Sequence, residues 1–296
     1  MSQNNTISTE SAVNTISPFR LKAINESLSM MSGHLSVEVS DGWTSSGPSQ
    51  VLAIRPKDTA NMKFLPVLHV SDLEPDMTPS EIAERIVSIY HDELHDIDFT
   101  QDATSKDYVL RHVVPRLINK DKVGDAQDSG IITEHFIGNL YIYWTVIIKD
   151  QGDEQISYAL DQRDLDSVGV TIDEIKPAAL GNIINTFEIT SIEDVLGLSD
   201  DSLTQTFYVA TNRRRHYGAT VLLFPEVLDS LEMKYGSYHI IPSSVHEVLI
   251  VPDSLRIGAQ ELKDMLVDVN STIVSDKDIL DDHIYRYENG RLSVVD

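Results

Sequence analysis

The stretch Tyr-His-Ile-Ile-Pro-Ser-Ser-Val-His-Glu-Val-Leu-Ile-Val, residues 238–251, carries the clearest fold signal in the chain. Its two ends, residues 238–241 and 247–251, are short runs rich in β-branched and aromatic side chains, which predicts a pair of strands. Helical patterns stand on either side, at 225–235 and 259–269. Strand pairs that alternate with helices predict an α+β fold, with antiparallel or mixed sheets and helices packed on one side.

The rest of the chain repeats this alternation. Thr78-Pro79-Ser80-Glu81 and Thr171-Ile172-Asp173-Glu174 are capping-box patterns that predict helix starts, and Pro177 predicts a kink or a break in the second helix. Further strands are predicted at 34–39, 51–54, 63–70, 113–118, 131–137, 140–148, 155–160, 207–211, 220–224, 283–287 and 292–295. Asn289-Gly290 predicts a hairpin turn between the last two, and Ser17 before Pro18 predicts the start of a first helix. We expect a disordered leader over 1–16, an N-terminal α+β module over 17–110 and a C-terminal α+β module over 111–296.

Composition restricts the chemistry and the location. The chain of 296 residues has no cysteine, which excludes disulfides, thiolate nucleophiles and cysteine-ligated metals. Its first residues lack the basic and apolar regions of a secretory signal, and no apolar run approaches the roughly 20 residues of a spanning helix. These features predict a cytoplasmic protein that does not enter membranes, and we expect neither a cofactor nor a metal.

The formal net charge of −24 is unevenly distributed. Residues 72–107 hold eleven acidic side chains against two basic ones, and residues 150–201 hold thirteen against two. Direct binding of nucleic acid is not expected, because it depends on basic side chains that displace counterions from phosphates. The acidic stretches are interpreted as a solvated surface, with a dock for a basic protein partner or a mimic of nucleic acid as alternatives.

The serine and histidine segment at 243–247 offers a possible catalytic pair. If residues 245–251 are extended, Ser244 and His246 lie on one face of the strand, whereas Val245 and Glu247 lie on the other. Because both faces are apolar, the strand is predicted to be central. Ser244 and His246 are therefore either a nucleophile and its base or buried polar groups bonded to neighbouring loops.

Two other polar clusters could each be either a binding site or an ordinary part of the surface. Arg213-Arg214-Arg215-His216 is a basic island that either receives a phosphate or carboxylate or pairs with acidic neighbours. His91 and His95 have the i, i+4 spacing of a helical metal site. The residue after His91 is Asp92, where the protease pattern requires Glu, so we expect an ordinary acidic helix end instead.

Several segments together resemble a bacterial family known as domain of unknown function 5688. They are residues 82–90, Pro115–Asn119, Ala179, Asn185-Thr186, Thr211-Asn212, Tyr217-Gly218-Ala219, residues 241–248 and Asp282-His283-Ile284-Tyr285. The chain departs from the family at Val168, where a tryptophan is expected before the glycine. The resemblance implies a fold and a bacterial setting, often on mobile elements, and implies no chemistry.

The leading hypothesis is a non-enzymatic interaction or accessory protein of bacterial mobile-element or phage biology. A hydrolase that uses Ser244 and His246 is the first alternative, and an acidic nucleic-acid mimic is the second. The candidate binding residues are Asn212, Arg214, Tyr217, Gly218, Ser243, Ser244, His246, Glu247 and His283.

Overall fold

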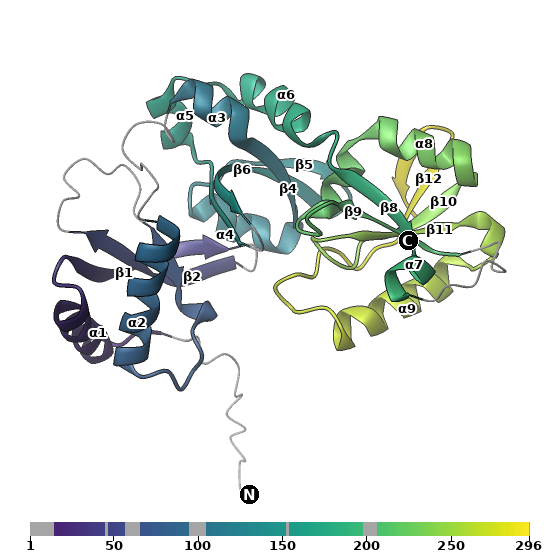
Figure 1. The fold of residues 1–296 in the computed structure, drawn as a ribbon. Coiled ribbons are helices and arrows are strands. Elements are labelled where there is room, and N and C mark those ends of the chain that lie inside the picture. The colour runs from purple at the N-terminus through teal and green to yellow at the C-terminus, as the bar shows by residue number, and fades with distance from the viewer. Residues whose placement is uncertain are drawn as a thin grey trace, which may run out of the picture. The chain divides into compact units, whose positions relative to one another are not determined.

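The computed structural model describes residues 15–44, 47–56, 66–94, 105–151, 154–197 and 206–295 (Figure 1). These residues fall into two compact units, one formed by residues up to 94 and the other by residues from 105 onward. The predicted module boundary at residue 110 falls inside helix α3 (Lys106–His112), which packs in the second unit. Antiparallel sheets and helices occur in both units, so the predicted α+β class is confirmed.

The first unit is a three-stranded sheet, in the order β1-β2-β3, packed against two helices. Figure 1 shows α1 and α2 side by side over this sheet. Ile16, inside the predicted leader, is buried in the same core, and its N–H donates to Gln50 Oε1 at 2.6 Å. The elements of this unit are α1 (Pro18–Met31), β1 (Leu35–Thr44), β2 (Gly47–Pro56), β3 (Val67–His69), the 3₁₀ helix η1 (Val70–Asp72), α2 (Pro79–Ser88) and the π-helix η2 (Ile89–Leu94).

Local capping residues start the helices where the sequence predicts. The Ser17 hydroxyl accepts the Arg20 N–H at 3.2 Å at the start of α1. At α2, the Thr78 hydroxyl accepts the Glu81 N–H at 3.3 Å, and Glu81 Oε2 accepts the Thr78 N–H at 2.7 Å. This reciprocal pair is the predicted capping box, which satisfies backbone donors that the first helical turn leaves unpaired.

The second unit begins with a four-stranded antiparallel sheet in which β6 pairs with β4, β5 and β7. Trp144 and Val146 of β6 pack with Val113 of β4 against the helices α3 and α6. The elements are α3, β4 (Val113–Asn119), η4 (Lys120–Lys122), α4 (Val123–Asp128), β5 (Thr133–Ile137), β6 (Leu140–Gln151), β7 (Glu154–Ala159), α5 (Gln162–Val168) and α6 (Ile172–Ile183).

A six-stranded antiparallel sheet follows, in the order β13-β12-β10-β11-β9-β8. Tyr238 and Ile240 of β10 pack toward α8, whereas Ile241 packs with Leu262 and Leu266 of α9. Helices therefore cover both faces of this sheet, rather than the one face expected (Figure 1). The elements are β8 (Phe187–Ser191), α7 (Ile192–Leu196), β9 (Tyr208–Asn212), η5 (Gly218–Leu223), α8 (Pro225–Tyr235), β10 (Tyr238–Ile241), β11 (Val248–Pro252), η6 (Asp253–Leu255), α9 (Ala259–Thr272), β12 (Tyr285–Glu288) and β13 (Arg291–Val294).

The predicted strand at 220–224 is wrong, because the chain forms the 3₁₀ helix η5 there. Ala219, Val221 and Leu222 are all buried, and an apolar run buried on every side has the same pattern in a strand and in a short helix. The helix around Pro177 is also unbroken from Ile172 to Ile183. Pro177 is exposed, so the backbone hydrogen bond that it cannot donate is lost at the solvent side.

The sequence patterns did not predict the short helices α3, α4, α5 and α7, nor strand β8. The predicted hairpin at Asn289-Gly290 is confirmed, and both residues have the positive φ of a type I′ turn. None of the helices described is long and apolar enough to cross a membrane.

Candidate functional site

Three segments that are distant in the sequence meet around the serine and histidine loop of the second unit. The Val245 N–H donates to Asp278 O at 2.9 Å, and Ser244 forms an isolated β-bridge with Ile279. On the other side of the loop, the Gly218 N–H donates to His246 O at 2.9 Å. The loop is therefore held between the start of η5 and the segment that precedes β12.

The prediction that residues 245–251 form one interior strand is wrong for its first three residues. Strand β11 begins at Val248, and the backbone of Val245 bonds to Asp278 and Ala219 instead of a neighbouring strand. Ser243, Ser244 and Val245 are nevertheless buried, so the segment is a covered loop. The alternation that placed Ser244 and His246 together on a strand face does not apply.

The Ser244 hydroxyl and the His246 ring are directed at different partners. Ser244 Oγ accepts the backbone N–H of His246 at 3.0 Å. His246 Nδ1 accepts the Tyr217 N–H at 3.3 Å, and its Nε2 lies 3.3 Å from Asp278 Oδ1. Because Nδ1 accepts, this network assigns the ring proton to Nε2. Both ring nitrogens are thereby engaged with groups other than the serine.

A turn closed by Asn212 places the two histidine rings together. Asn212 Oδ1 accepts the N–H groups of Arg214 at 3.1 Å and His216 at 3.2 Å, and Asn212 Nδ2 donates to His216 O at 2.7 Å. The turn ends with Tyr217 in the left-handed region at φ 54°. The His216 ring then stacks on the His246 ring, with centroids 5.1 Å apart and an angle of 17°.

Arg116 of strand β4 lies beside this turn and is 7% exposed. Its guanidinium carbon is 3.7 Å from the centroid of the Tyr217 ring, a cation–π contact. Its Nη2 donates to Gln155 Oε1 at 2.7 Å and to Ser157 Oγ at 3.1 Å. A permanent cation is therefore buried among neutral partners.

The electrostatics at the histidine pair follow from burial and from these cations. Burial, followed by the nearby Arg116 and His246, lowers the pKa of His216 to about 4, against the opposing effect of Asp278. The His216 imidazole is consequently neutral at neutral pH. A neutral imidazole can donate from one ring nitrogen and accept at the other.

The basic island is partly paired with acidic residues. Arg214 forms an ion pair with Asp150, and Arg213 Nε lies 3.7 Å from Glu188 Oε1. The Arg213 pair is exposed to solvent, where such pairs contribute little to stability. The Arg214 side chain is only 31% exposed, and its positive charge contributes to the lowered pKa of His216.

A second polar cluster surrounds the buried carboxylate of Asp281. Its Oδ1 accepts the Asp282 N–H at 2.8 Å and the amides of Asn139 at 3.2 Å and Asn119 at 3.4 Å, whereas its Oδ2 accepts the Tyr285 hydroxyl. His283 Nδ1 lies 3.1 Å from Asp281 Oδ1. Asn119 ends β4 and Asn139 lies in the turn between β5 and β6, so this carboxylate joins the four-stranded sheet to the six-stranded one.

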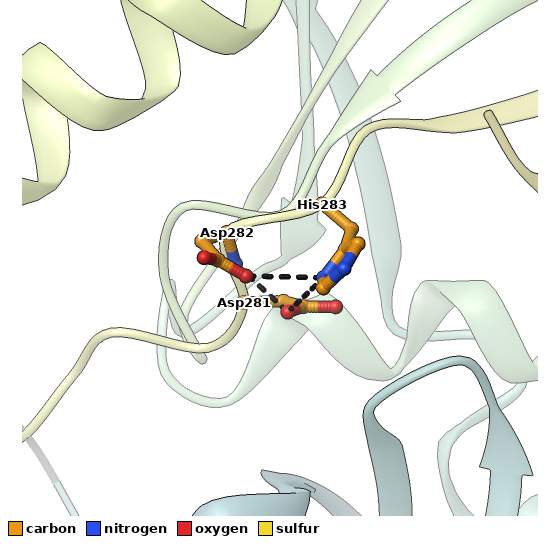
Figure 2. A group of neighbouring side chains, drawn as sticks. All are labelled: Asp281, Asp282 and His283. Atoms are coloured by element: carbon orange, nitrogen blue, oxygen red, sulfur yellow. Dashed lines mark hydrogen bonds and ion pairs between the residues drawn. The ribbon is translucent and has the colours of Figure 1, made fainter. Parts of the chain in front are cut away.

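Figure 2 shows Asp281, Asp282 and His283 turned toward one another. Each offers one atom that could bind a cation, and these atoms lie within 4.8 Å of one another. The Asp281 oxygens, however, are already occupied by several hydrogen-bond donors, which account for the burial of this carboxylate. The cluster is therefore a hydrogen-bonded junction between the two sheets.

The predicted site residues thus divide into two groups. Asn212, Tyr217, Gly218, Ser244 and His246 meet around the loop, and Arg214 reaches them through the turn; His283 belongs to the Asp281 junction. The Ser243 backbone carbonyl accepts the Leu280 N–H at 3.3 Å, and Glu247 is half-buried at the end of the loop. The interpretation of His91 and His95 stays a prediction, because His95 lies outside the described residues. His91 is exposed on η2.

Sequence reasoning missed Arg116, Asp278 and Asp281. One signal could have indicated Arg116, since it interrupts the apolar strand Val113–Asn119. Nothing local distinguishes Asp278 or Asp281 from the many other acidic residues of this chain. Their role depends on the partners that the fold brings to them.

Comparison with curated proteins and with solved structures gave no match. A family model, described as a family of unknown function (DUF5688), matches residues 52–289. That range includes every residue of the two clusters described above. Because the match covers most of the chain, this protein belongs to the family of unknown function DUF5688.

Proposed function

We propose that this chain is a non-enzymatic binding protein whose binding face is made by the Asn212–Gly218 turn and the adjoining His246. The observation that carries the proposal is the engagement of both His246 ring nitrogens, by Tyr217 and Asp278. A serine nucleophile needs a base whose free ring nitrogen can take its proton. Here Ser244 instead accepts a backbone N–H, which orders the loop.

The candidate face combines rigidity with access to solvent, which supports a role in binding. The turn is held by three hydrogen bonds of the Asn212 side chain, so its conformation exists before any ligand arrives. The His246 side chain is 28% exposed and can contact a ligand. Polar groups on a loop that a scaffold holds in place are a common feature of binding sites.

Labelling with a fluorophosphonate tests the alternative of a serine hydrolase. We expect no adduct on Ser244 in the wild-type protein by intact and peptide mass spectrometry, with a known serine hydrolase labelled in parallel. An adduct on Ser244 that disappears in the His246→Gln variant would show an activated nucleophile. That outcome would overturn the non-enzymatic proposal.

Capture of ligands from a lysate of the source organism tests the binding face. We expect the wild-type protein to retain a ligand that the double variant Arg214→Ala/His216→Ala loses, with both proteins folded by circular dichroism. Arg111→Ala is the matched control, because Arg111 is an exposed, ion-paired arginine on α3. If the double variant and the control retain the same ligands, the binding face lies elsewhere.

A further inference from the structure

We infer that the binding face takes a dianionic phosphate group, held by His216 and Arg214 beside the stacked His246 ring and the buried Arg116. This inference rests on the proposed function and names the class of ligand. Its first support is the charge of Arg116, since no carboxylate of the described residues lies within 4.0 Å of that guanidinium. A buried charge without an opposite charge is strongly unfavourable, so an anion is the partner that the described residues do not supply to Arg116.

The carboxylates near the face are already committed to other groups. Asp150 forms an ion pair with Arg214, and its Oδ1 also accepts the Gln155 amide at 3.4 Å. Asp278 is directed at the His246 ring. Arg116 is therefore linked to the Asp150 carboxylate through the neutral Gln155.

The side chains at the face are of the types that bind phosphate. Arginine and protonated histidine form charge-assisted hydrogen bonds to phosphate oxygens, which are stronger than bonds between neutral groups. Backbone N–H groups of the turn are used internally: those of Arg214 and His216 bond to Asn212, and that of Tyr217 bonds to His246. The ligand is consequently held by side chains.

Arg116 and His216 together favour a dianion over a carboxylate. Arg116 can balance one negative charge, and a second is balanced if the His216 ring takes up a proton when the ligand binds. Burial and, after it, the nearby positive charges lower the pKa of His216 in the free protein, and an arriving dianion would stabilise the protonated ring against both. A monoanion would leave no second charge for this ring to balance.

Titration of the full chain with inorganic phosphate at constant ionic strength tests the inference, with the histidine ring signals followed by NMR. We expect the signals of His216 and His246 to shift and saturate, while those of His135, an exposed histidine on β5, stay unchanged. Acetate at equal concentration should shift them far less. Equal responses to both anions, or no response at the two rings, would overturn the inference.

Variants identify the contacts. We expect the dissociation constant for phosphate to rise about tenfold in His216→Ala and in Arg214→Ala, as expected for loss of a hydrogen bond to a charged group. Arg111→Ala should bind as the wild type does. Unchanged affinity in both site variants would contradict the inference. Phosphate binding at these rings together with a fluorophosphonate adduct on Ser244 would retain the anion site and overturn only the non-enzymatic proposal.

Discussion

We expect Gly218→Ala to lower the free energy of unfolding by roughly 3 kcal/mol, a shift of roughly 6–12 °C in the melting temperature. A Cβ atom at this position would lie 2.3 Å from Thr211 Oγ1, 2.6 Å from Asn212 N and 2.6 Å from His246 O. Two of these are backbone atoms, which cannot move aside as a flexible side chain can. The change must therefore separate η5 from β9 or from the His246 loop.

Gly181→Ala is the matched control for this prediction. Gly181 lies within α6, and a Cβ atom there would meet nothing within 4 Å. Replacing an interior helical glycine by alanine stabilises a helix by roughly 0.5–1 kcal/mol, so this variant should melt at or above the wild-type temperature. Thermal unfolding by circular dichroism compares the two. If Gly218→Ala melts with the wild type, the close approach of η5 to the loop is wrong.

The second large effect is expected for Asp281→Asn, which should cost roughly 3 kcal/mol of stability. Asp281 is 1% exposed, and its carboxylate accepts hydrogen bonds from Tyr285, Asn119, Asn139 and the backbone of Asp282. An asparagine keeps the shape but turns one oxygen into an amide that itself donates. At the Oδ1 position, that amide would face the N–H donors of Asn119, Asn139 and Asp282; at the Oδ2 position, it would remove the charged acceptor of the Tyr285 hydroxyl. Either orientation therefore loses charge-assisted hydrogen bonds at a buried position.

Asp282→Asn separates this effect from a general loss of negative charge. Its carboxylate is exposed and contacts His283, with 3.0 Å between Oδ1 and Nδ1. Changes at exposed sites of this kind usually alter stability by less than about 0.5 kcal/mol. Denaturant titration followed by tryptophan fluorescence should thus distinguish the two variants. Equal midpoints for Asp281→Asn and the wild type would show that the carboxylate is not what holds the junction.

Gly218 and Asp281 both hold the segments around the His246 loop in place. Gly218 lets η5 approach the His246 loop, and Asp281 joins the loop before β12 to the two asparagines of the four-stranded sheet. The His246 loop of the candidate face contacts Gly218 on one side and the segment that carries Asp281 on the other. We expect a loss of either attachment to weaken phosphate binding through misplacement of the histidine rings.

Signals within a few residues predicted the local structure well. The caps at Ser17 and Thr78 and the turn at Asn289-Gly290 form as expected, because each is stabilised by groups within one turn of the chain. The α+β class followed from the alternation of strand and helix patterns. Where a run was apolar throughout, as at η5, the pattern could not separate a strand from a buried helix.

The sequence by itself determined the class of fold, the starts of the longer helices, the family resemblance and the group of polar residues around 212–218 and 243–247. Only the tertiary structure decided what those residues do. It turned Ser244 toward a backbone N–H, aimed the His246 ring at Asp278 and Tyr217, and set Arg116 of a different sheet against the Tyr217 ring. The physical reason is that hydrogen bonds and charges act over a few ångströms in space, and residues distant along the chain become neighbours only when the sheets pack.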